Sequence, residues 1–254
     1  MTIDDRIRMA RQALVDIQSE LVAKLANDRS RARANVIRQL HEIRGMLTPS
    51  FPYASQAGQD VVIDRVLDRK RGGTFVDIGA YDGVTGSNSL FFERNRGWTG
   101  VLVEPVAVQR AKAEQHRTAP CLAYAVADKK GVAEFMAVTE GYTQMSGLVK
   151  TYDKRMLDRV RADKRHAELV IKVPTRSLSQ ILTEAGIPDP DFVSLDIEGG
   201  ELAALRKFPF DKHDVKIWAI ENNAGDPALP ALMQENGYDL IEFCGPDEIY
   251  SKGR

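Results

Sequence analysis

The chain has 254 residues with a formal net charge of −1, and hydrophobic and charged residues make up 43% and 28% of it. This usage is typical of a globular protein that can bury a full core. The balanced charge supplies no overall field that would recruit nucleic acid or an acidic membrane, so neither is expected as a partner.

The cysteines and the apolar runs of the chain indicate the cellular compartment in which it is expected. The two cysteines, Cys121 and Cys244, are far apart and lie in apolar runs, so small core residues are expected rather than a disulfide framework. No run approaches the ~18 apolar residues that a membrane span needs, and the charged start of the chain lacks the apolar core of a signal peptide. We therefore expect a soluble protein of the reducing cytoplasm.

Residues 1–48 are predicted to form a helical arm, followed by a catalytic domain over residues 49–254. Residues 3–47 contain no proline, and their apolar residues recur at alternating spacings of four and three, as in a coiled-coil seam. The first part of this seam consists of Ile3, Ile7, Ala10, Leu14, Ile17 and Leu21. The seam falters over residues 26–32 and then resumes. Two interpretations stay open: helices packed on their own domain, or a coiled-coil arm that makes homo-oligomers.

From residue 55 onward, predicted strands and helices alternate. The apolar runs at residues 74–78, 100–103, 121–126, 191–195 and 215–220 are predicted strands, and residues 60–69, 87–94, 106–116, 201–205 and 228–235 are predicted helices. Two short segments, 238–243 and 248–250, are expected to form an antiparallel hairpin at one edge. The alternation predicts an α/β fold with a parallel sheet covered on both faces. Residues 139–170 interrupt it and are expected to be a functional or mobile loop insertion that contains a helix.

The first predicted strand ends in the segment Phe75-Val-Asp-Ile-Gly-Ala-Tyr-Asp-Gly83. In open α/β sheets, ligands bind beyond the carboxyl ends of the strands, and glycines such as Gly79 and Gly83 permit tight turns there. A dinucleotide site would show the spacing G-x-G-x-x-G around a pyrophosphate. Here the spacing is G-x-x-x-G, and Asp77 precedes it. A carboxylate would repel a pyrophosphate but suits the cationic amine and sulfonium of S-adenosylmethionine, so the segment predicts a site for that cofactor.

Acidic residues also follow the next two predicted strands. Glu104, after the second strand, can accept hydrogen bonds from both ribose hydroxyls. Asp128 follows the third strand, where the adenine amino group would lie. The alternative, that these residues are helix caps or turn residues, stays open.

Five segments of the chain together resemble the FkbM family of methyltransferases, over about residues 53–251. They are residues 55–60, 73–89, 97–105, 194–201 and the ending with 237–238 and 247–250. The resemblance implies the class I, Rossmann-like methyltransferase fold, with a seven-stranded, mostly parallel sheet to which the N-terminal arm is added. It also implies O-methylation of a hydroxyl, on a sugar, a glycan or a glycosylated metabolite. A non-sugar secondary metabolite as acceptor, a catalytically inactive scaffold and a nicotinamide-dependent dehydrogenase are the alternatives.

The resemblance also implies which residues bind the cofactor and the acceptor. Those assigned to S-adenosylmethionine are Asp77, Gly79, Tyr81, Gly83, Ser87, Asn88, Glu104, Pro105 and Asp128. Gln56 and Asp60 would lie over the methionine end or the acceptor. Ser146 belongs to a segment, 141–148, whose small and hydroxyl residues are typical of a lid that touches a carbohydrate or small-molecule acceptor.

Carboxylates at the ends of the fourth and fifth strands indicate where the chemistry would occur. Methyl transfer requires alignment of an oxygen with the methyl carbon and removal of the hydroxyl proton. In one interpretation, Asp196 or Glu198 is a general base. In the other, Asp196, Glu221 and Asn222 hold Mg²⁺ through oxygen ligands, a pattern similar to catechol O-methyltransferase. That enzyme has a lysine three residues after the strand-four acid, where this chain has Gly199, so a carboxylate base is favoured.

Overall fold

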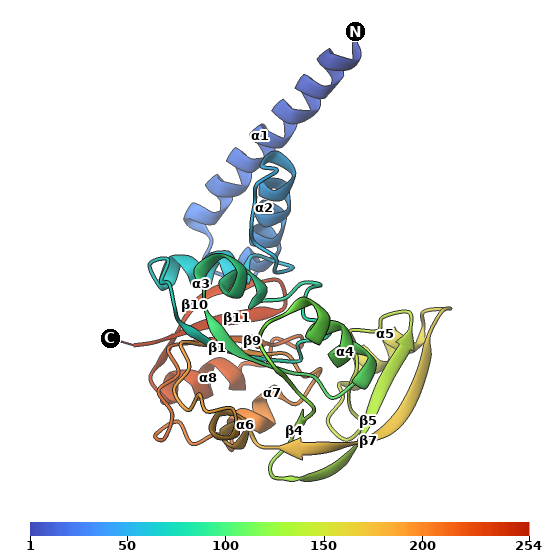
Figure 1. The fold of residues 1–254 in the computed structure, drawn as a ribbon. Helices are drawn as coiled ribbons and strands as arrows, with labels where there is room; N and C mark the ends of the chain where they lie inside the picture. The colour runs from blue at the N-terminus through green and yellow to red at the C-terminus, as the bar shows by residue number, and fades with distance from the viewer. Residues whose placement is uncertain (254) are drawn as a thin grey trace.

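A computed structural model of the protein describes residues 1–253 and contains a seven-stranded sheet in the order β10-β11-β9-β8-β1-β2-β3 (Figure 1). The strands are β1 (Thr74–Ile78), β2 (Thr99–Val103), β3 (Cys121–Leu122), β8 (Phe192–Leu195), β9 (Ile217–Glu221), β10 (Tyr238–Cys244) and β11 (Asp247–Lys252). Strand β11 runs antiparallel to both of its neighbours, and the other pairings in this sheet are parallel. The predicted seven-stranded, mostly parallel class I methyltransferase sheet with a terminal hairpin is confirmed.

The central strands are apolar along their length because both faces of the sheet are covered. Successive side chains of a strand point to opposite faces. Val76 and Val193 therefore belong to one core cluster, which helices α6 to α8 cover, and Phe75 and Phe192 belong to the other. The covering helices are α3 (Gln59–Val66), α4 (Ala107–His116), α6 (Leu178–Glu184), α7 (Glu201–Leu205) and α8 (Ala228–Glu235). The parallel strands consequently end together at one edge of a layered core.

The helix predicted over residues 87–94 forms only in part. Helical backbone begins at Leu90 and continues as the π-helical turn η1 (Phe92–Arg96). The start is delayed because the hydroxyls of Ser87 and Ser89 both donate to the Asp77 carboxylate, which draws this segment over the end of β1.

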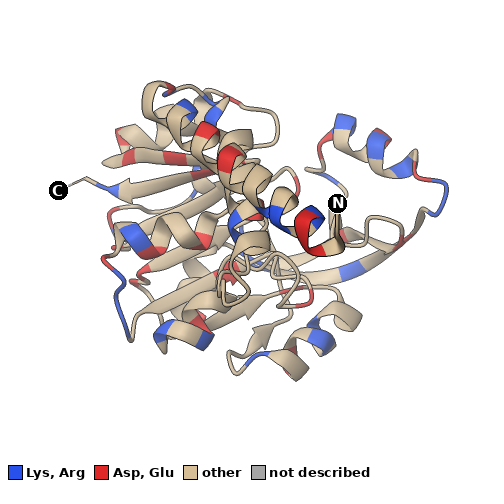
Figure 2. Cartoon of the chain, turned by 90° about the horizontal axis from the view of Figure 1, so that it is seen from above, with Lys and Arg blue, Asp and Glu red and all other residues tan. Residues whose placement is uncertain are grey.

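A second sheet of four strands, in the order β4-β7-β5-β6, stands beside the first. Its strands are β4 (Ala125–Val126), β5 (Gly131–Glu140), β6 (Gly147–Leu148) and β7 (Ala167–Arg176). The prediction that residues 121–126 form a single strand, the third in the chain, was wrong. This segment is divided between the two sheets, because β3 pairs with β2 whereas β4 pairs with β7. Residues 139–170 contain the predicted helix, α5 (Lys154–Arg161), and they also form β6 and the start of β7, which a loop insertion would not. Helix α5 is rich in Lys and Arg, whose positions are blue on the ribbon in Figure 2, and it lies apart from the main sheet.

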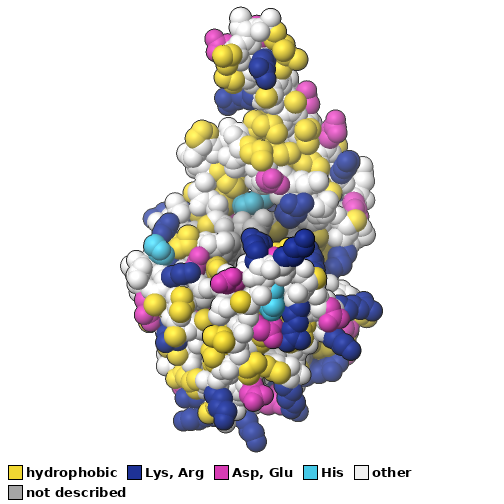
Figure 3. All heavy atoms as spheres, turned by 90° about the vertical axis from the view of Figure 1, so that its right-hand side faces the viewer, with side chains coloured by type: hydrophobic (Ala, Val, Ile, Leu, Met, Phe, Trp, Pro, Cys, Tyr) yellow, Lys and Arg dark blue, Asp and Glu magenta, His cyan; other side chains and the backbone are white. Residues whose placement is uncertain are grey.

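The N-terminal arm is a helical hairpin of α1 (Ile3–Asn27) and α2 (Arg33–Leu47). Leu21 packs against Leu40 and Ile43 inside the hairpin. Helix α2 also lies against the edge strand β10, where the Arg33 guanidinium forms an ion pair of 2.6 Å with Glu242. The first half of α1 projects beyond α2 and carries exposed hydrophobic side chains (Figures 1 and 3). None of the described helices is long and apolar enough to cross a membrane.

Candidate functional site

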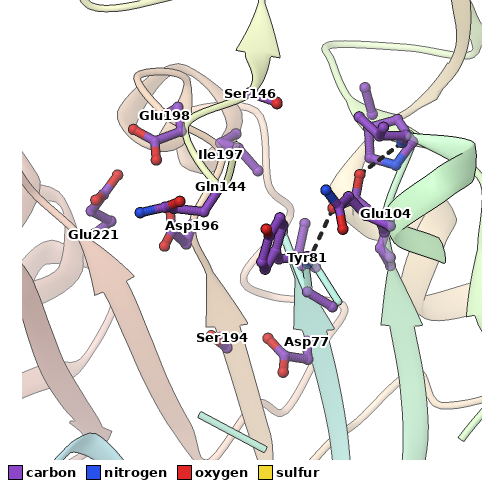
Figure 4. Close-up of a pocket in the computed structure, with 18 of the residues that line it drawn as sticks. Asp77, Tyr81, Glu104, Gln144, Ser146, Ser194, Asp196, Ile197, Glu198 and Glu221 are labelled. Atoms are coloured by element: carbon purple, nitrogen blue, oxygen red, sulfur yellow. Dashed lines mark hydrogen bonds between the residues drawn. The ribbon is translucent and has the colours of Figure 1, made fainter. Parts of the chain in front are cut away.

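A cavity of about 250 Å³ opens at the carboxyl ends of β1, β2, β8 and β9 (Figure 4). Parallel strands present their carboxyl ends at one edge of the sheet, and ligand sites of α/β proteins form there. The predicted site residues that line it are Gln56, Asp77, Gly79, Tyr81, Ser87, Asn88, Glu104, Pro105, Ser146, Asp196, Glu198 and Glu221. The fold thus gathers residues from distant parts of the chain into one cavity.

The turn after β1 depends on glycine. Gly79 has φ of +84°, and a Cβ built on it would lie 1.7 Å from the backbone oxygen of Asp196. Only a residue without a side chain can let the β1 turn pass this close to the end of β8. Two residues later Tyr81 has φ of +50°, a conformation that L-residues rarely adopt.

The Asp77 carboxylate at the floor of the cavity is held by two serines and, through them, by an arginine. Asp77 accepts hydrogen bonds from Ser89 Oγ (2.5 Å) and Ser87 Oγ (3.3 Å). The guanidinium of Arg117, whose side chain is 0% exposed, donates to both serine hydroxyls and to the backbone oxygen of Gly83. Sequence reasoning missed Arg117, because a basic residue just after a helix is ordinarily a solvated C-terminal charge.

Glu104 closes the other side of the cavity. Its carboxylate accepts hydrogen bonds from the backbone N–H groups of Tyr81 (3.1 Å) and Val106 (2.7 Å). Burial raises the pKa of Glu104 to about 7. Each carboxylate oxygen keeps a second acceptor position, so Glu104 can still accept hydrogen bonds from a diol.

Apolar groups form the wall beside Glu104. Pro105, Tyr124 and Phe135 line the cavity there and suit a flat aromatic base. Asp128 does not reach this wall: it lines a separate cavity beside the second sheet. The chain crosses from β3 to that sheet at Tyr124, so Asp128 follows β4 rather than a strand of the main sheet.

Two further residues assigned by resemblance lie away from the cavity lining. Asp60 is 0% exposed, and its carboxylate accepts hydrogen bonds from the backbone of Ala54 and from Ser55 Oγ, so it fixes the start of α3. Gly83 packs against α4, where a Cβ would lie 3.0 Å from the Cβ of Ala113. Both residues shape the site from outside it.

Three buried acceptor atoms of the cavity have no hydrogen-bond partner among residues 1–253. They are Asn88 Oδ1, Gln109 Oε1 and Glu198 Oε2. An unsatisfied buried acceptor costs about 1–3 kcal/mol, so such atoms indicate a ligand that supplies donors. S-adenosylmethionine carries an amine, ribose hydroxyls and an adenine amino group, and the residues present fit it.

At the end of the cavity away from Glu104, the carboxylates of Asp196, Glu198 and Glu221 gather (Figure 4). One oxygen from each lies within 4.8 Å of the others, and we call these residues the carboxylate cluster. Glu198 is held at φ of +59°, and strained backbone of this kind is common at functional sites.

The protein supplies the carboxylate cluster with further negative charge rather than with cations. Desolvation raises the pKa of Asp196 to about 8, and the charges of Asp247 and Glu201 add to the rise. Burial and the neighbouring carboxylates raise the pKa values of Glu198 and Glu221 well above their usual range. Asp247, which sequence reasoning did not assign to the site, is itself buried and accepts hydrogen bonds from Gln59 and Asn88.

A second cavity of about 440 Å³ lies on the other side of the carboxylate cluster. Glu198 and Glu221 line both cavities, whereas Thr151, Lys154 and Asn223 line only the second. The carboxylate cluster therefore separates two cavities, and two ligands could meet across it.

Part of the segment 141–148 lines the first cavity, and none of it lines the second. Gln144 and Ser146 line it, and Thr143 Oγ1 lies 2.6 Å from the Tyr81 hydroxyl in a hydrogen bond. The Ser146 hydroxyl is engaged locally, because it donates to the backbone oxygen of Thr143 and accepts from the Val138 N–H.

Asn222 is not a member of the carboxylate cluster. Its amide accepts from the backbone N–H of Asp226 and donates to Glu248 and to the Asp226 backbone oxygen. The metal ligand set predicted from the acid–asparagine pair therefore needs revision. Glu201, at the start of α7, is engaged with the backbone, since its carboxylate accepts from the N–H groups of Ile197 and Gly199.

The sequence model of the family described as Methyltransferase FkbM domain matches residues 77–240. The chain belongs to the FkbM methyltransferase family. No curated protein sequence matches the chain.

Solved structures similar to this FkbM-family chain are distant from it. An FkbM methyltransferase from Methylobacillus flagellatus KT is 14% identical over 93% of this chain and 58% of its own length, with a TM-score of 0.46. A TehB-like SAM-dependent methyltransferase from Corynebacterium glutamicum is 14% identical over 77% of this chain and 88% of its own, with a TM-score of 0.40. The chain thus spans less than two thirds of the length of the FkbM structure that it matches.

Proposed function

We propose that the protein is an S-adenosylmethionine-dependent O-methyltransferase that acts on a hydroxyl of a sugar, a glycan or a glycosylated metabolite. The observation that carries this proposal is the carboxylate cluster between two cavities, because a methyl donor and a hydroxyl acceptor must meet beside a group that takes up the proton. Membership of the FkbM family supports the methyl donor.

The first cavity is the proposed cofactor site. When bound, S-adenosylmethionine supplies a methyl group on a positively charged sulfur. Glu104 would accept the ribose hydroxyls, and the unpartnered Asn88 Oδ1 would accept from the methionine amine beside Asp77. Pro105 and Tyr124 would contact the base.

The second cavity is the proposed acceptor site. Its lining combines hydroxyl, amide and charged side chains, including Thr151, Asn223 and Lys154. Such a lining offers many hydrogen bonds to an acceptor rich in hydroxyls, and its apolar members, among them Tyr152 and Met156, can contact the C–H groups of a sugar ring.

The proton of the acceptor hydroxyl must leave as its oxygen bonds to the methyl carbon. Glu198 is the first candidate base, because it lines both cavities and its Oε2 has no other partner among the described residues. Asp196 is the second candidate, and its pKa of about 8 suits proton uptake near neutral pH. The hydroxyl proton would pass to one of these carboxylate oxygens.

Calorimetry with S-adenosylhomocysteine and with NAD, followed by mass spectrometry of methylated glycans, tests the proposal. We expect the wild-type protein and Glu198→Gln to bind S-adenosylhomocysteine alike, and only the wild type to add a mass of one methyl group to a glycan. Binding of NAD alone would overturn the proposal, and absence of nucleoside binding would favour an inactive scaffold. Methylation of a non-sugar metabolite alone would overturn the acceptor class.

We also propose that residues 1–48 form an arm through which two chains associate, distinct from a catalytic domain over residues 49–254. Ile3 and Ile7, at 75% and 61% exposure, continue the apolar seam of α1 beyond the end of α2. A second copy of α1 in antiparallel orientation would cover the exposed part of this seam, while Leu21 stays packed against α2.

The charges on α1 favour the antiparallel orientation. Arg6 flanks the apolar seam near its start and Glu20 flanks it two heptads later, so antiparallel pairing places Arg6 beside Glu20 of the other copy. Parallel pairing would instead place Arg6 against Arg11, since these residues flank the seam at the g position of one heptad and the e position of the next.

A further inference from the structure

The carboxylate cluster holds more negative charge than the surrounding protein balances. Asp196, Glu198 and Glu221 present oxygens within 4.8 Å of one another, and the charged groups that act on them most strongly are the further carboxylates Asp247 and Glu201. In the part of the chain that the structure describes, no lysine or arginine forms an ion pair with the three clustered residues. Buried carboxylates are normally paired or bind a metal.

A second observation concerns Glu198 alone. Its side chain is 7% exposed, yet its Oε2 atom has no hydrogen-bond partner among residues 1–253. A proton shared with a neighbouring carboxylate through Oε1 would neutralise Glu198, but it would still leave Oε2 without a partner. Figure 4 shows the Glu198 carboxylate directed toward the other acids, so its free oxygen points to a missing positively charged ligand.

We propose that Asp196, Glu198 and Glu221 bind one divalent cation of the Mg²⁺ or Mn²⁺ class at the junction of the two cavities. All three residues offer hard oxygen ligands. Asp196 directly follows β8 and Glu221 is the last residue of the adjacent parallel strand β9, which fixes their separation. No histidine or cysteine belongs to the carboxylate cluster, so a soft ligand set for zinc is not present there.

The position of this site gives it a role in the proposed function, on which this part of the inference rests. Magnesium prefers six oxygen ligands, so three carboxylates leave positions for water and for acceptor oxygens. Glu198 and Glu221 face the second cavity, and an acceptor with two adjacent oxygens would be oriented there. Because each carboxylate has two oxygens, a residue that binds the cation through one of them keeps the other for the acceptor proton.

The test is titration of the full chain with Mn²⁺ alone, after treatment with a chelator and in the absence of cofactor and acceptor. We expect one Mn²⁺ per chain by calorimetry. We expect binding at least tenfold weaker in Glu221→Gln and in Glu198→Gln, and unchanged in Glu184→Gln, which alters a surface carboxylate paired with Arg176. Binding of S-adenosylhomocysteine by each variant shows that it is folded.

The outcomes separate this site from the proposed function. Absence of saturable Mn²⁺ binding, or binding that both cluster variants retain at full strength, would overturn the metal site. Methyl transfer that persists after chelation would leave the proposed function intact while removing the cation from it. Stoichiometric Mn²⁺ binding without methyl transfer to any glycan would support the site and count against the function.

Discussion

The backbone of Gly79 passes so close to that of Asp196 that a Cβ on the glycine would lie 1.7 Å from the Asp196 carbonyl oxygen. This contact joins the turn of the proposed cofactor site to the strand end that carries the carboxylate cluster. The two parts of the site are therefore in direct backbone contact, and a substitution that displaces the turn should also displace the carboxylate cluster.

Gly79→Ala should destabilise the protein strongly and abolish cofactor binding. The new side chain meets both a left-handed backbone conformation, at φ of +84°, and the backbone of β8. We expect a loss of more than about 2 kcal/mol in the free energy of unfolding, measured by urea denaturation. Gly72→Ala is the matched control, since Gly72 has φ of +66° but open space around it, and it should lose only about 1 kcal/mol. Equal losses in the two variants would show that the close contact with Asp196 has no effect.

Glu104→Gln should weaken the binding of S-adenosylhomocysteine and flatten its dependence on pH. The pKa of Glu104 is raised to about 7, so the carboxylate loses its proton between pH 6 and 8 and becomes a better acceptor for a diol. Wild-type affinity should therefore rise several-fold over this interval, and the variant should bind about tenfold or more weakly at pH 8. Calorimetry at the two pH values checks this, and a wild-type affinity independent of pH would contradict it.

Strand ends could be predicted from the sequence because the apolar runs are long and parallel strands end at one edge. Asp77, Glu104, Asp196 and Glu221 were placed at a common edge on that argument, and they line one cavity. Asp128 was placed there too, but nothing in the apolar run 121–126 reveals that the chain leaves the sheet halfway along it.

Other features of the site depend on side-chain contacts that spacing does not encode. Asp60 and Asn222 have the residue types of ligand-binding groups, yet backbone donors nearby satisfy them. Arg117 is buried only because Ser87, Ser89 and Glu93 converge on it from another segment. A sequence pattern gives the residue type but not its hydrogen-bond partners, so such assignments require the structure.

Asp196→Asn should remove methyl transfer while making the folded protein more stable at alkaline pH. The folded-state pKa of Asp196 is raised from 3.8 to about 8, so the neutral form is favoured on folding. The stability that the neutral Asp196 carboxyl contributes to the folded protein is fully present below about pH 4 and is lost as the pH rises through about 8. Without bound metal, the variant should thus exceed the wild type by on the order of 1–3 kcal/mol at pH 9 and by much less at pH 5.

Chemical denaturation in the presence of a chelator at pH 5, 7 and 9 measures this difference. Glu184→Gln, outside the carboxylate cluster, should follow the wild type at every pH. A stability difference between Asp196→Asn and the wild type that stays constant from pH 5 to pH 9 would contradict the prediction.

Charge exchange on α1 should control the association of two chains. Arg6→Glu should weaken the dimer, because it places two acidic residues together in the antiparallel pairing, where Arg6 lies beside Glu20. The double variant with Glu20→Arg should restore it, since the pair is then re-formed with its charges exchanged. Analytical ultracentrifugation of the full chain gives the dissociation constants, and Ile7→Asp, which places a charge in the apolar seam, should yield monomers.

The same variants distinguish the two orientations of the arm. In a parallel pairing, Arg6 faces Arg11, so Arg6→Glu would strengthen the dimer and Glu20→Arg would not act through it. Arg6 and Glu20 are both exposed in a single chain, so neither substitution should alter the folded domain. A wild-type protein that stays monomeric at high concentration would remove the arm as a dimerisation element and leave the catalytic proposal untouched.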